Sequence, residues 1–313
     1  MVEKREIDIL LVTYNAEKYI AQALDSIFNQ TLCDNMSARI VVVDDCSKDG
    51  TLSIIHCKEK ESPFPFKYIE GNNNLGITRN YQRAFSNCTA DYVAVLEGDD
   101  YWCSPKHLQQ HIDFLEEHKE CSMSANRFVI LRQSTGVMDS PNKEIICSGA
   151  YKLIALSDLF PYNHIGNFSS CVYRGSNLKK INQKIWDVQI DYVDDWMIAM
   201  ELAHYGLIGQ LQDCTTVYRQ NDASTWANLS VKEKRQRTIH RIEECDKFYN
   251  YKYSKQFNAH KQLIKESISY NQMSEMRKKY PLIIVYVYEF VRHIPKLFLS
   301  PDAKNKLKKW LKK

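Results

Sequence analysis

Runs of mostly apolar residues alternate with amphipathic stretches through the first hundred residues of the chain. The runs predict strands covered on both faces, at Ile7–Thr13, Arg39–Val43, Phe66–Glu70 and Tyr92–Leu96. Between them, apolar residues recur at helical spacing, in a stretch that opens at Asn15 and in 52–60 and 77–88. Strands alternating with helices predict an α/β fold with a doubly wound, mainly parallel sheet, whose ligands bind at the carboxyl ends of the strands.

Beyond the fourth predicted strand the pattern is mixed. It predicts helices at 107–118 and 196–205 and strands at 123–131 and 169–173. Past Ser230 the sequence becomes polar, basic and helical in pattern. We therefore predict one domain over residues 1–229, with halves at about 1–103 and 104–229, followed by a basic helical C-terminal extension over 230–313.

Positive charge gathers in this extension. The chain has 313 residues and a net charge of +4, yet residues 230–313 carry 21 Lys and Arg against 8 Asp and Glu, whereas residues 1–229 carry 21 against 30. An acidic body with a basic tail predicts chemistry in the body and attachment to an anionic partner through the tail.

The N-terminal residues and the cysteines indicate the cellular compartment of the protein. Met1–Asp8 is charged, the run Ile9–Val12 is too short for a signal-peptide core, and no stretch reaches the roughly 18–20 apolar residues of a membrane span. The ten cysteines show no paired CxxC spacing, so we expect reduced thiols. These features predict a cytoplasmic protein.

Three carboxylates follow the fourth predicted strand, at Glu97, Asp99 and Asp100. Clustered acids at the end of an apolar strand repel one another and lose hydration. A hard divalent cation, Mg²⁺ or Mn²⁺, would offset both costs, and such ions bind through one or two carboxylates plus substrate phosphates. The alternative is a solvated acidic turn that caps the helix after Ser104.

Polar residues at other strand ends suit a phosphorylated ligand. Thr13–Asn15 ends the first strand beside a helix N-terminus, where backbone N–H groups favour anions. Tyr14 could pack on a nucleobase, Asp45 could accept from a base or ribose, and Arg79 could pair with phosphate. Each has a structural alternative: Tyr14 in the core, Asp45 as a cap of "CSKDGT", and Arg79 on a helix surface.

Four stretches of the sequence then stand in the order found in a known family. They are "VTYNAEKYIAQALDSIFNQT", "VVVDDCSKDGT", "NNNLGITRNYQRAFSNCTADYVAVLEGDDYW" and "VDDWMIAMELAHYG". Over roughly residues 5–225 the chain resembles the family 2 inverting glycosyltransferases, of the type that builds bacterial cell-surface glycans. The resemblance implies a glycosyltransferase-A fold, a nucleotide-diphosphate-sugar donor such as a UDP-sugar, and Mn²⁺ or Mg²⁺. It makes 1–103 the nucleotide-sugar half and 104–229 the acceptor half.

The resemblance also implies roles for single residues on the donor side. The residues that match the family's nucleoside-binding positions are Thr13, Tyr14, Asn15 and Glu17, together with Asp45 of the pair Asp44–Asp45 as the base contact. The family's acidic metal motif matches Glu97–Gly98–Asp99 followed by Asp100, with Glu97 in place of the usual first Asp. We expect Asp100, and then Asp99, to reach the metal, with Asp99 also at the donor.

On the acceptor side the resemblance points to an acidic pair before a helix. It matches Asp194–Asp195, and the second residue is the usual base. Asp194, Trp196 and His164 are the implied acceptor contacts. "VYRQNDAST", 217–225, lies where relatives have a flexible loop that closes over the diphosphate, which makes Arg219 the candidate phosphate partner.

The chemistry requires such a base independently of the resemblance. A sugar hydroxyl is a poor nucleophile, and a carboxylate within hydrogen-bond reach removes its proton as it attacks the anomeric carbon. The alternative for Asp195 is N-capping of the helix. One member of the pair can cap the helix while the other acts as the base.

Two other functions and two roles for the tail stay open at this point. A nucleotidyltransferase that makes nucleotide sugars would usually carry a glycine-rich basic loop after strand one, and "TYNAEKYI" has no glycine. A non-catalytic glycan-assembly partner would not need these acids. The apolar and lysine-rich end, 281–313, predicts either a helix packed on the domain or an interfacial helix on the anionic inner face of the cell membrane, near a glycan or lipid-linked glycan acceptor. No aromatic–basic motif indicates nucleic-acid binding.

Overall fold

The computed structural model describes residues 4–69, 71–139, 149–160, 163, 165–190, 192–221 and 228–265. Two compact units divide the chain, Met1–Phe257 and Asn258–Lys313. The predicted interfacial segment, 281–313, lies outside the described residues. Within the part that the structure describes, no helix is long and apolar enough to cross a membrane.

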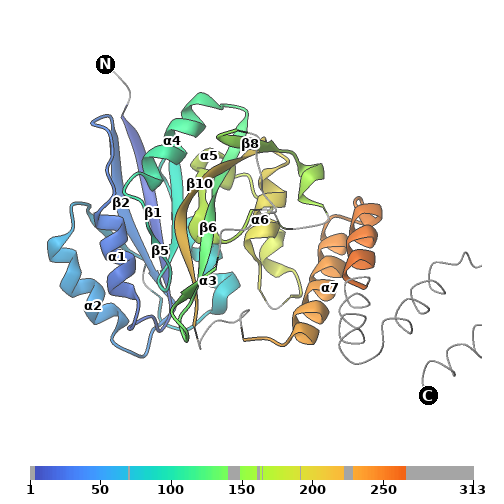
Figure 1. Cartoon of the computed structure of the whole chain (residues 1–313), viewed down its shortest axis with the longest axis horizontal. Coiled ribbons are helices and arrows are strands. Elements are labelled where there is room, and N and C mark those ends of the chain that lie inside the picture. The colour runs from blue at the N-terminus through green and yellow to red at the C-terminus, as the bar shows by residue number, and fades with distance from the viewer. Residues whose placement is uncertain are drawn as a thin grey trace, which may run out of the picture. The chain divides into compact units, whose positions relative to one another are not determined.

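One sheet of ten strands organises the described part of the first unit (Figure 1). Its order is β3-β2-β1-β4-β9-β6-β10-β5, with β7 paired to β6 and β8 to β10. The strands are β1 (Arg5–Thr13), β2 (Met36–Asp44), β3 (Phe66–Tyr68), β4 (Tyr92–Glu97), β5 (Tyr101–Trp102), β6 (Cys121–Arg132), β7 (Val137–Met138), β8 (Tyr151–Ile154), β9 (Cys171–Arg174) and β10 (Leu207–Gln220).

Helices connect these strands and cover the sheet (Figure 1). They are α1 (Ile20–Phe28), α2 (Thr51–Lys58), α3 (Gly76–Ser86), α4 (His107–Glu117), α5 (Gly175–Leu178), α6 (Asp195–Leu202) and α7 (Val231–Phe248). Short 3₁₀ turns stand at Glu59–Glu61, Leu156–Leu159, Phe168–Ser170 and Gln183–Asp187. Helix α1 begins five residues after Asn15, because residues 14–19 form the loop that follows β1.

The four strands predicted in the first half are confirmed, and they are parallel. β1 pairs with β2 and β4, and β2 pairs with β3, all in parallel register. Residues Ile7–Thr13 of β1 are buried without a break. A strand with both faces covered reads as a continuous apolar run, which is why the sequence pattern located it.

The second half of the sheet is mixed. β9 is antiparallel to both β4 and β6, whereas β10 is parallel to β6. The long strand β10 was not predicted, because polar residues interrupt its apolar pattern and its register to β6 shifts between Gln210 and Thr216. The flexible loop expected at 217–225 needs a correction: Val217–Gln220 belongs to β10, and residues 222–227 lie outside the described residues.

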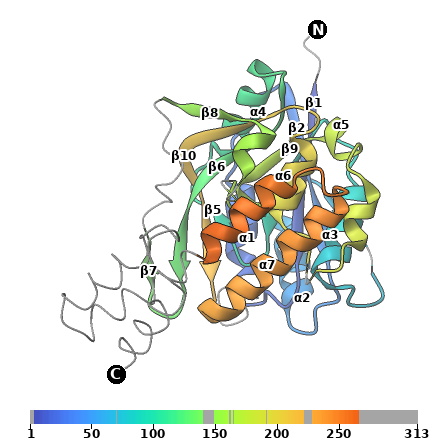
Figure 2. The same ribbon diagram turned by 90° about the vertical axis from the view of Figure 1, so that its right-hand side faces the viewer.

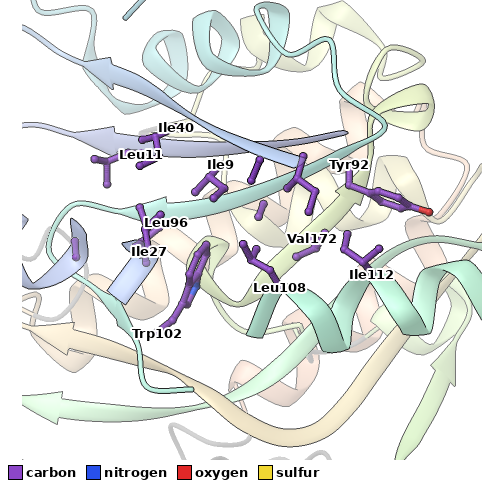
Figure 3. Close-up of a cluster of buried hydrophobic side chains, with 14 of the residues drawn as sticks. Ile9, Leu11, Ile27, Ile40, Tyr92, Leu96, Trp102, Leu108, Ile112 and Val172 are labelled. Carbon is purple, nitrogen blue, oxygen red and sulfur yellow. The ribbon is translucent and has the colours of Figure 1, made fainter. Parts of the chain in front are cut away.

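A single apolar cluster joins both halves on one face of the sheet (Figure 3). Ile9, Leu11, Ile40 and Leu96 project from neighbouring strands toward Ile27 of α1. The same cluster continues past Trp102 and Val172 to α4, whose contribution includes Leu108 and Ile112. Burial of these side chains, worth about 1.5–3 kcal/mol each, fixes the strands whose carboxyl ends carry the acids.

Helix α7 belongs to the first compact unit, beside α6 (Figure 2). It begins at a capping box in which Ser230 and Glu233 bond each other's backbone N–H groups. Helix α7 thus begins directly after the boundary predicted near residue 230 and still belongs to the first compact unit.

Candidate active site

Three strand ends meet at one edge of the sheet. Thr13 of β1 lies in register with Asp44 of β2, and Val12 lies in register with Glu97 of β4. The acids after β2 and β4 therefore lie at the same edge of the sheet, on either side of the end of β1. This edge is where open α/β sheets bind ligands.

The loop after β1 is held against the loop after β2. Asn15 has a φ of 50°, and its N–H donates to Ser47 Oγ at 2.8 Å while its side-chain oxygen accepts from the Lys48 N–H at 2.8 Å. Glu17 accepts from the Gly50 N–H at 2.9 Å. Asn15 and Glu17, predicted at the nucleoside, thus shape this loop. Tyr14, directly before Asn15, is 49% exposed, which excludes its alternative as a core residue.

The two acids after β2, Asp44 and Asp45, accept hydrogen bonds from different loops. Asp44 accepts from the Ser47 N–H at 2.8 Å and closes the "CSKDGT" turn. Asp45 accepts from the N–H groups of Leu75 and Gly76 at 2.8 and 2.9 Å, and so fixes the start of α3. Each Asp45 oxygen thus accepts one of these bonds, and the residue is 3% exposed.

Glycine is required inside the acidic turn after β4. A Cβ on Gly98 would lie 2.5 Å from Thr13 Oγ1, so only glycine lets the turn approach β1. That Thr13 hydroxyl is buried and has no hydrogen-bond partner among the described residues. Glu97 accepts from the Tyr81 hydroxyl at 2.8 Å. Burial, and then the charge of Asp99, raise the pKa of Glu97 to about 7.

Asp100 is the most buried acid of this turn, at 1% exposed. Its Oδ2 accepts from Ser169 Oγ at 2.6 Å and from Asn167 at 3.4 Å, and its Oδ1 accepts from the Arg219 N–H at 2.8 Å. Burial, followed by the charges of Asp99 and Glu97, raises the pKa of Asp100 well above its usual range. The roles of Ser169 and Asn167 were not predicted from the sequence.

Asp99 is half-buried and accepts from the Asn221 side chain at 2.9 Å. Burial raises the pKa of the Asp99 carboxyl. Of the two predicted metal ligands, Asp99 is therefore the more accessible, whereas both oxygens of Asp100 already accept hydrogen bonds.

Arg219 lies under this turn. It is 4% exposed, and its Nε donates to the Asp99 backbone oxygen at 2.7 Å. Its terminal nitrogens donate to Gln22 and Gln133, and the guanidinium carbon stands 4.6 Å from the ring centre of Tyr19. In this arrangement Arg219 supports the acidic turn through its backbone, while its role as a phosphate partner stays a prediction.

Arg79 lies on the exposed side of α3. Its Nη2 pairs with Asp187 at 2.7 Å and its Nη1 donates to Gln82 at 2.7 Å, with 45% of the side chain exposed. An exposed pair of this kind contributes about 0–1 kcal/mol, so an anionic ligand could compete for the guanidinium.

The second acidic pair stands at the start of α6. Asp194 caps the helix by accepting from the Met197 N–H at 3.1 Å, which confirms that one member of the pair caps. Asp195 Oδ1 accepts from Asn163 at 2.8 Å and from the Trp196 N–H at 2.7 Å. No described residue donates to Oδ2. Burial, and then the charge of Asp194, raise the pKa of Asp195 well above its usual range.

Of the two remaining predicted acceptor contacts, the structure describes Trp196 but not His164. Trp196 is 3% exposed, and its indole N–H donates to the Leu159 backbone oxygen at 3.0 Å. His164 lies outside the described residues. Asn163, next to it, was not predicted; its only signal in the sequence was its place directly before His164.

The acidic turn has the chemistry of a hard-cation site. Its three carboxylates offer oxygen atoms as metal ligands, and burial disfavours their charged forms. Among the described residues, none of the three forms an ion pair with a cationic side chain. No group of three or more His, Cys, Asp or Glu side chains in the described part of the chain converges on one metal position. A cation here would therefore complete its shell with ligand phosphates and water, as Mg²⁺ usually does.

Comparison with known sequences identifies the family. The family model described as Glycosyl transferase family 2 matches residues 8–168, more than half of the chain. The chain belongs to this family. Rv1520 of Mycobacterium tuberculosis, an uncharacterised protein, is 26% identical over 218 residues, which cover 70% of this chain and 60% of that protein. The chain thus spans about 60% of the length of this relative.

Two further relatives connect sequence and structure. The poly(ribitol-phosphate) beta-N-acetylglucosaminyltransferase TarS of Staphylococcus aureus is 32% identical over 111 residues, 35% of this chain and 19% of that protein. The crystal structure of TarS 1–349 with UDP-GlcNAc matches with a TM-score of 0.55 at 19% identity, covering 77% of this chain and 66% of that one. The mannosyltransferase PcManGT from Pyrobaculum calidifontis, in complex with GDP-Man and Mn²⁺, matches with a TM-score of 0.62 at 15% identity, covering 99% and 86%.

At these identities the structural likeness establishes the fold. The predicted glycosyltransferase-A fold, a doubly wound sheet followed by a helical C-terminal region, is confirmed. The sheet is more mixed than predicted in its second half.

Proposed function

We propose that this glycosyltransferase is an inverting, metal-dependent enzyme that transfers a sugar from a nucleotide-diphosphate donor to a hydroxyl of a glycan or lipid-linked glycan. The observation that carries the proposal is the pairing of two acidic sites in one molecule. One is the buried acidic turn after β4, and the other is Asp195, whose Oδ2 receives no hydrogen bond from a described residue.

The donor would bind at the carboxyl ends of β1, β2 and β4. Tyr14 offers an exposed ring for the nucleobase, and Asp45 offers its remaining lone pairs to the base. Arg79 would exchange Asp187 for the diphosphate. A UDP-sugar is the proposed donor class, because TarS, to which this chain is similar, has been crystallised with UDP-GlcNAc.

Mn²⁺ or Mg²⁺ would be held by Asp99 first, because it is more accessible, with Asp100 as the second candidate. When bound, such an ion neutralises the charge that develops on the departing diphosphate. Arg219 would hold the turn in place through the Asp99 carbonyl oxygen. Tyr81 would orient the Glu97 carboxylate by its hydrogen bond.

Asp195 would take the proton from the acceptor hydroxyl at Oδ2. Its Oδ1 is fixed by two N–H donors, so the carboxylate plane cannot rotate freely. Attack from this side, opposite the leaving diphosphate, would invert the configuration at the anomeric carbon. Asp194, Trp196 and His164 remain the proposed acceptor-side residues.

The proposed acceptor belongs to cell-surface polysaccharide assembly. The support is the similarity to TarS, a poly(ribitol-phosphate) beta-N-acetylglucosaminyltransferase, together with the sequence of the basic tail. Attachment of that tail to an anionic membrane surface is testable by deleting the residues after Lys279. Unchanged membrane fractionation would contradict it.

The primary test is incubation of the protein with Mn²⁺ and a panel of UDP-glucose, UDP-galactose, UDP-GlcNAc and GDP-mannose. We expect release of a nucleoside diphosphate from one donor, accelerated by a glycan acceptor, with loss of activity in EDTA. Release of inorganic pyrophosphate from a sugar phosphate and a nucleoside triphosphate would instead identify a nucleotidyltransferase. A thermal-shift screen of the same panel gives a second readout, since a true ligand stabilises the protein by mass action.

A further inference from the structure

Arg241 reaches from α7 to the acidic pair at the start of α6. Its Nη1 donates to Asp194 Oδ2 at 2.6 Å, and the two side chains are only 11% and 13% exposed. The guanidinium carbon also stands 5.1 Å from the ring centre of Tyr192. Removal of one partner of such a buried pair leaves the other charge uncompensated, so the position is sensitive to substitution.

We propose that Arg241 is a positioning residue for sugar transfer, because it fixes the first turn of α6 and supplies positive charge beside Asp194 and Asp195. This inference rests on the proposed role of Asp195 as the base. It makes α7, a helix beyond the predicted domain boundary, part of the working active site.

The hydrogen bonds show how the positioning would operate. Asp194 uses one oxygen to cap α6 through the Met197 N–H and the other to accept from Arg241. The cap sets where the helix begins, and Asp195 is the first residue of that helix. Arg241 therefore acts on Asp195 through its neighbour and touches no reacting atom itself.

The positive charge of Arg241 also affects the pKa of Asp195. The acids that face Asp195 are Asp194 and Glu97, which raise its pKa after the larger effect of burial, whereas Arg241 lowers it. Cys171 of β9 is also near, and its pKa is raised to about 12, chiefly by burial. Among the described residues, Tyr173 of β9 and Tyr192 are further titratable neighbours, and burial raises the pKa of both phenols. The thiol and the phenols therefore stay neutral at physiological pH.

The test compares four full-length variants with the wild type. Arg241→Gln removes the charge, and Arg241→Lys keeps it. Lys232→Gln is the matched control, since Lys232 is an exposed cation of the same helix. The double variant Asp194→Asn with Arg241→Gln removes both members of the ion pair but leaves an oxygen to cap the helix.

The measurement is the pH profile of kcat/KM, with the donor from the panel above that the wild type uses and with water as acceptor if no glycan is active. For Arg241→Gln we expect the rising acid limb to move up by roughly one to three pH units, with the donor KM within about two-fold of wild type. Arg241→Lys and Lys232→Gln should keep the wild-type limb. The double variant should recover most of the shift, which a merely structural role would not produce.

An unshifted limb in folded Arg241→Gln overturns the inference. If that variant does not fold, the double variant decides, because a folded double variant with the shifted limb also contradicts a role through charge. If the wild type releases no nucleoside diphosphate from any donor, the proposed function fails instead. Melting temperatures then still test the charge effect: Arg241→Gln should lose more stability at pH 8 than at pH 5, and an equal loss at both overturns it.

Discussion

The two acidic pairs of this protein look alike in sequence and differ in how their charge is balanced. Asp99–Asp100, with Glu97, makes no ion pair with a described cationic side chain, whereas Asp194–Asp195 has Arg241 at 2.6 Å. Burial raises the pKa of acids in both places. The difference supports the proposal that an external cation would offset the charge of the first pair, whereas Arg241 offsets the charge of the second.

Of the changes considered, Asp195→Asn should have the largest effect. It alters the pair Asp194–Asp195, whose charge Arg241 offsets. The amide keeps an oxygen for Asn163 and the Trp196 N–H but cannot accept a proton, so we expect kcat to fall by about 10²–10⁴-fold. Donor stabilisation in a thermal-shift assay should persist. The exposed variant Asp113→Asn is the control, and full transfer activity in Asp195→Asn would rule out this base.

Asp99→Asn should weaken the proposed cation site in the acidic turn after β4. Two neighbouring carboxylates remain, so we expect Mn²⁺ to bind roughly 10- to 100-fold more weakly, with a matching loss of donor affinity. Calorimetric titration with Mn²⁺, with and without UDP, measures this loss. A wild-type Mn²⁺ affinity would mean that Asp100 or Glu97 carries the metal.

The pH dependence of stability sharpens the comparison at Glu97. Its pKa in the folded protein is about 7, above the ordinary value of 4.5, so between these values the folded state binds more protons than the unfolded state. This group's contribution therefore lowers stability as pH rises through that window. Mn²⁺ binds the ionised form, so the Tm gain on adding Mn²⁺ should be larger at pH 8 than at pH 5. An equal gain at both pH values would place the ion away from Glu97.

The same contrast explains what the sequence could predict. β1 and β4 are covered on both faces and their acids follow at the strand ends, so local pattern sufficed to place the first site. Asn163, Ser169 and Arg241 reach their acids across 32, 69 and 47 positions of the chain. Contacts at such separations depend on topology that no local pattern encodes. β10 was missed because its buried polar residues, such as Gln210 and Thr216, resemble a loop.

Trp196→Phe should have the smallest effect. It tests whether the indole of Trp196 contributes to the surroundings of Asp195. The change removes the indole N–H that donates to the Leu159 oxygen but keeps the backbone N–H that donates to Asp195. We expect a loss of about 1–3 kcal/mol in the free energy of unfolding, because a buried carbonyl loses its donor, and a melting temperature lower by about 2–4 °C per kcal/mol. Tyr205→Phe, which removes an exposed hydroxyl bond to the Lys180 oxygen, is the matched control and should change little. A shift of the acid limb in Trp196→Phe would show that the indole, and not only Arg241 and the backbone, sets the state of Asp195.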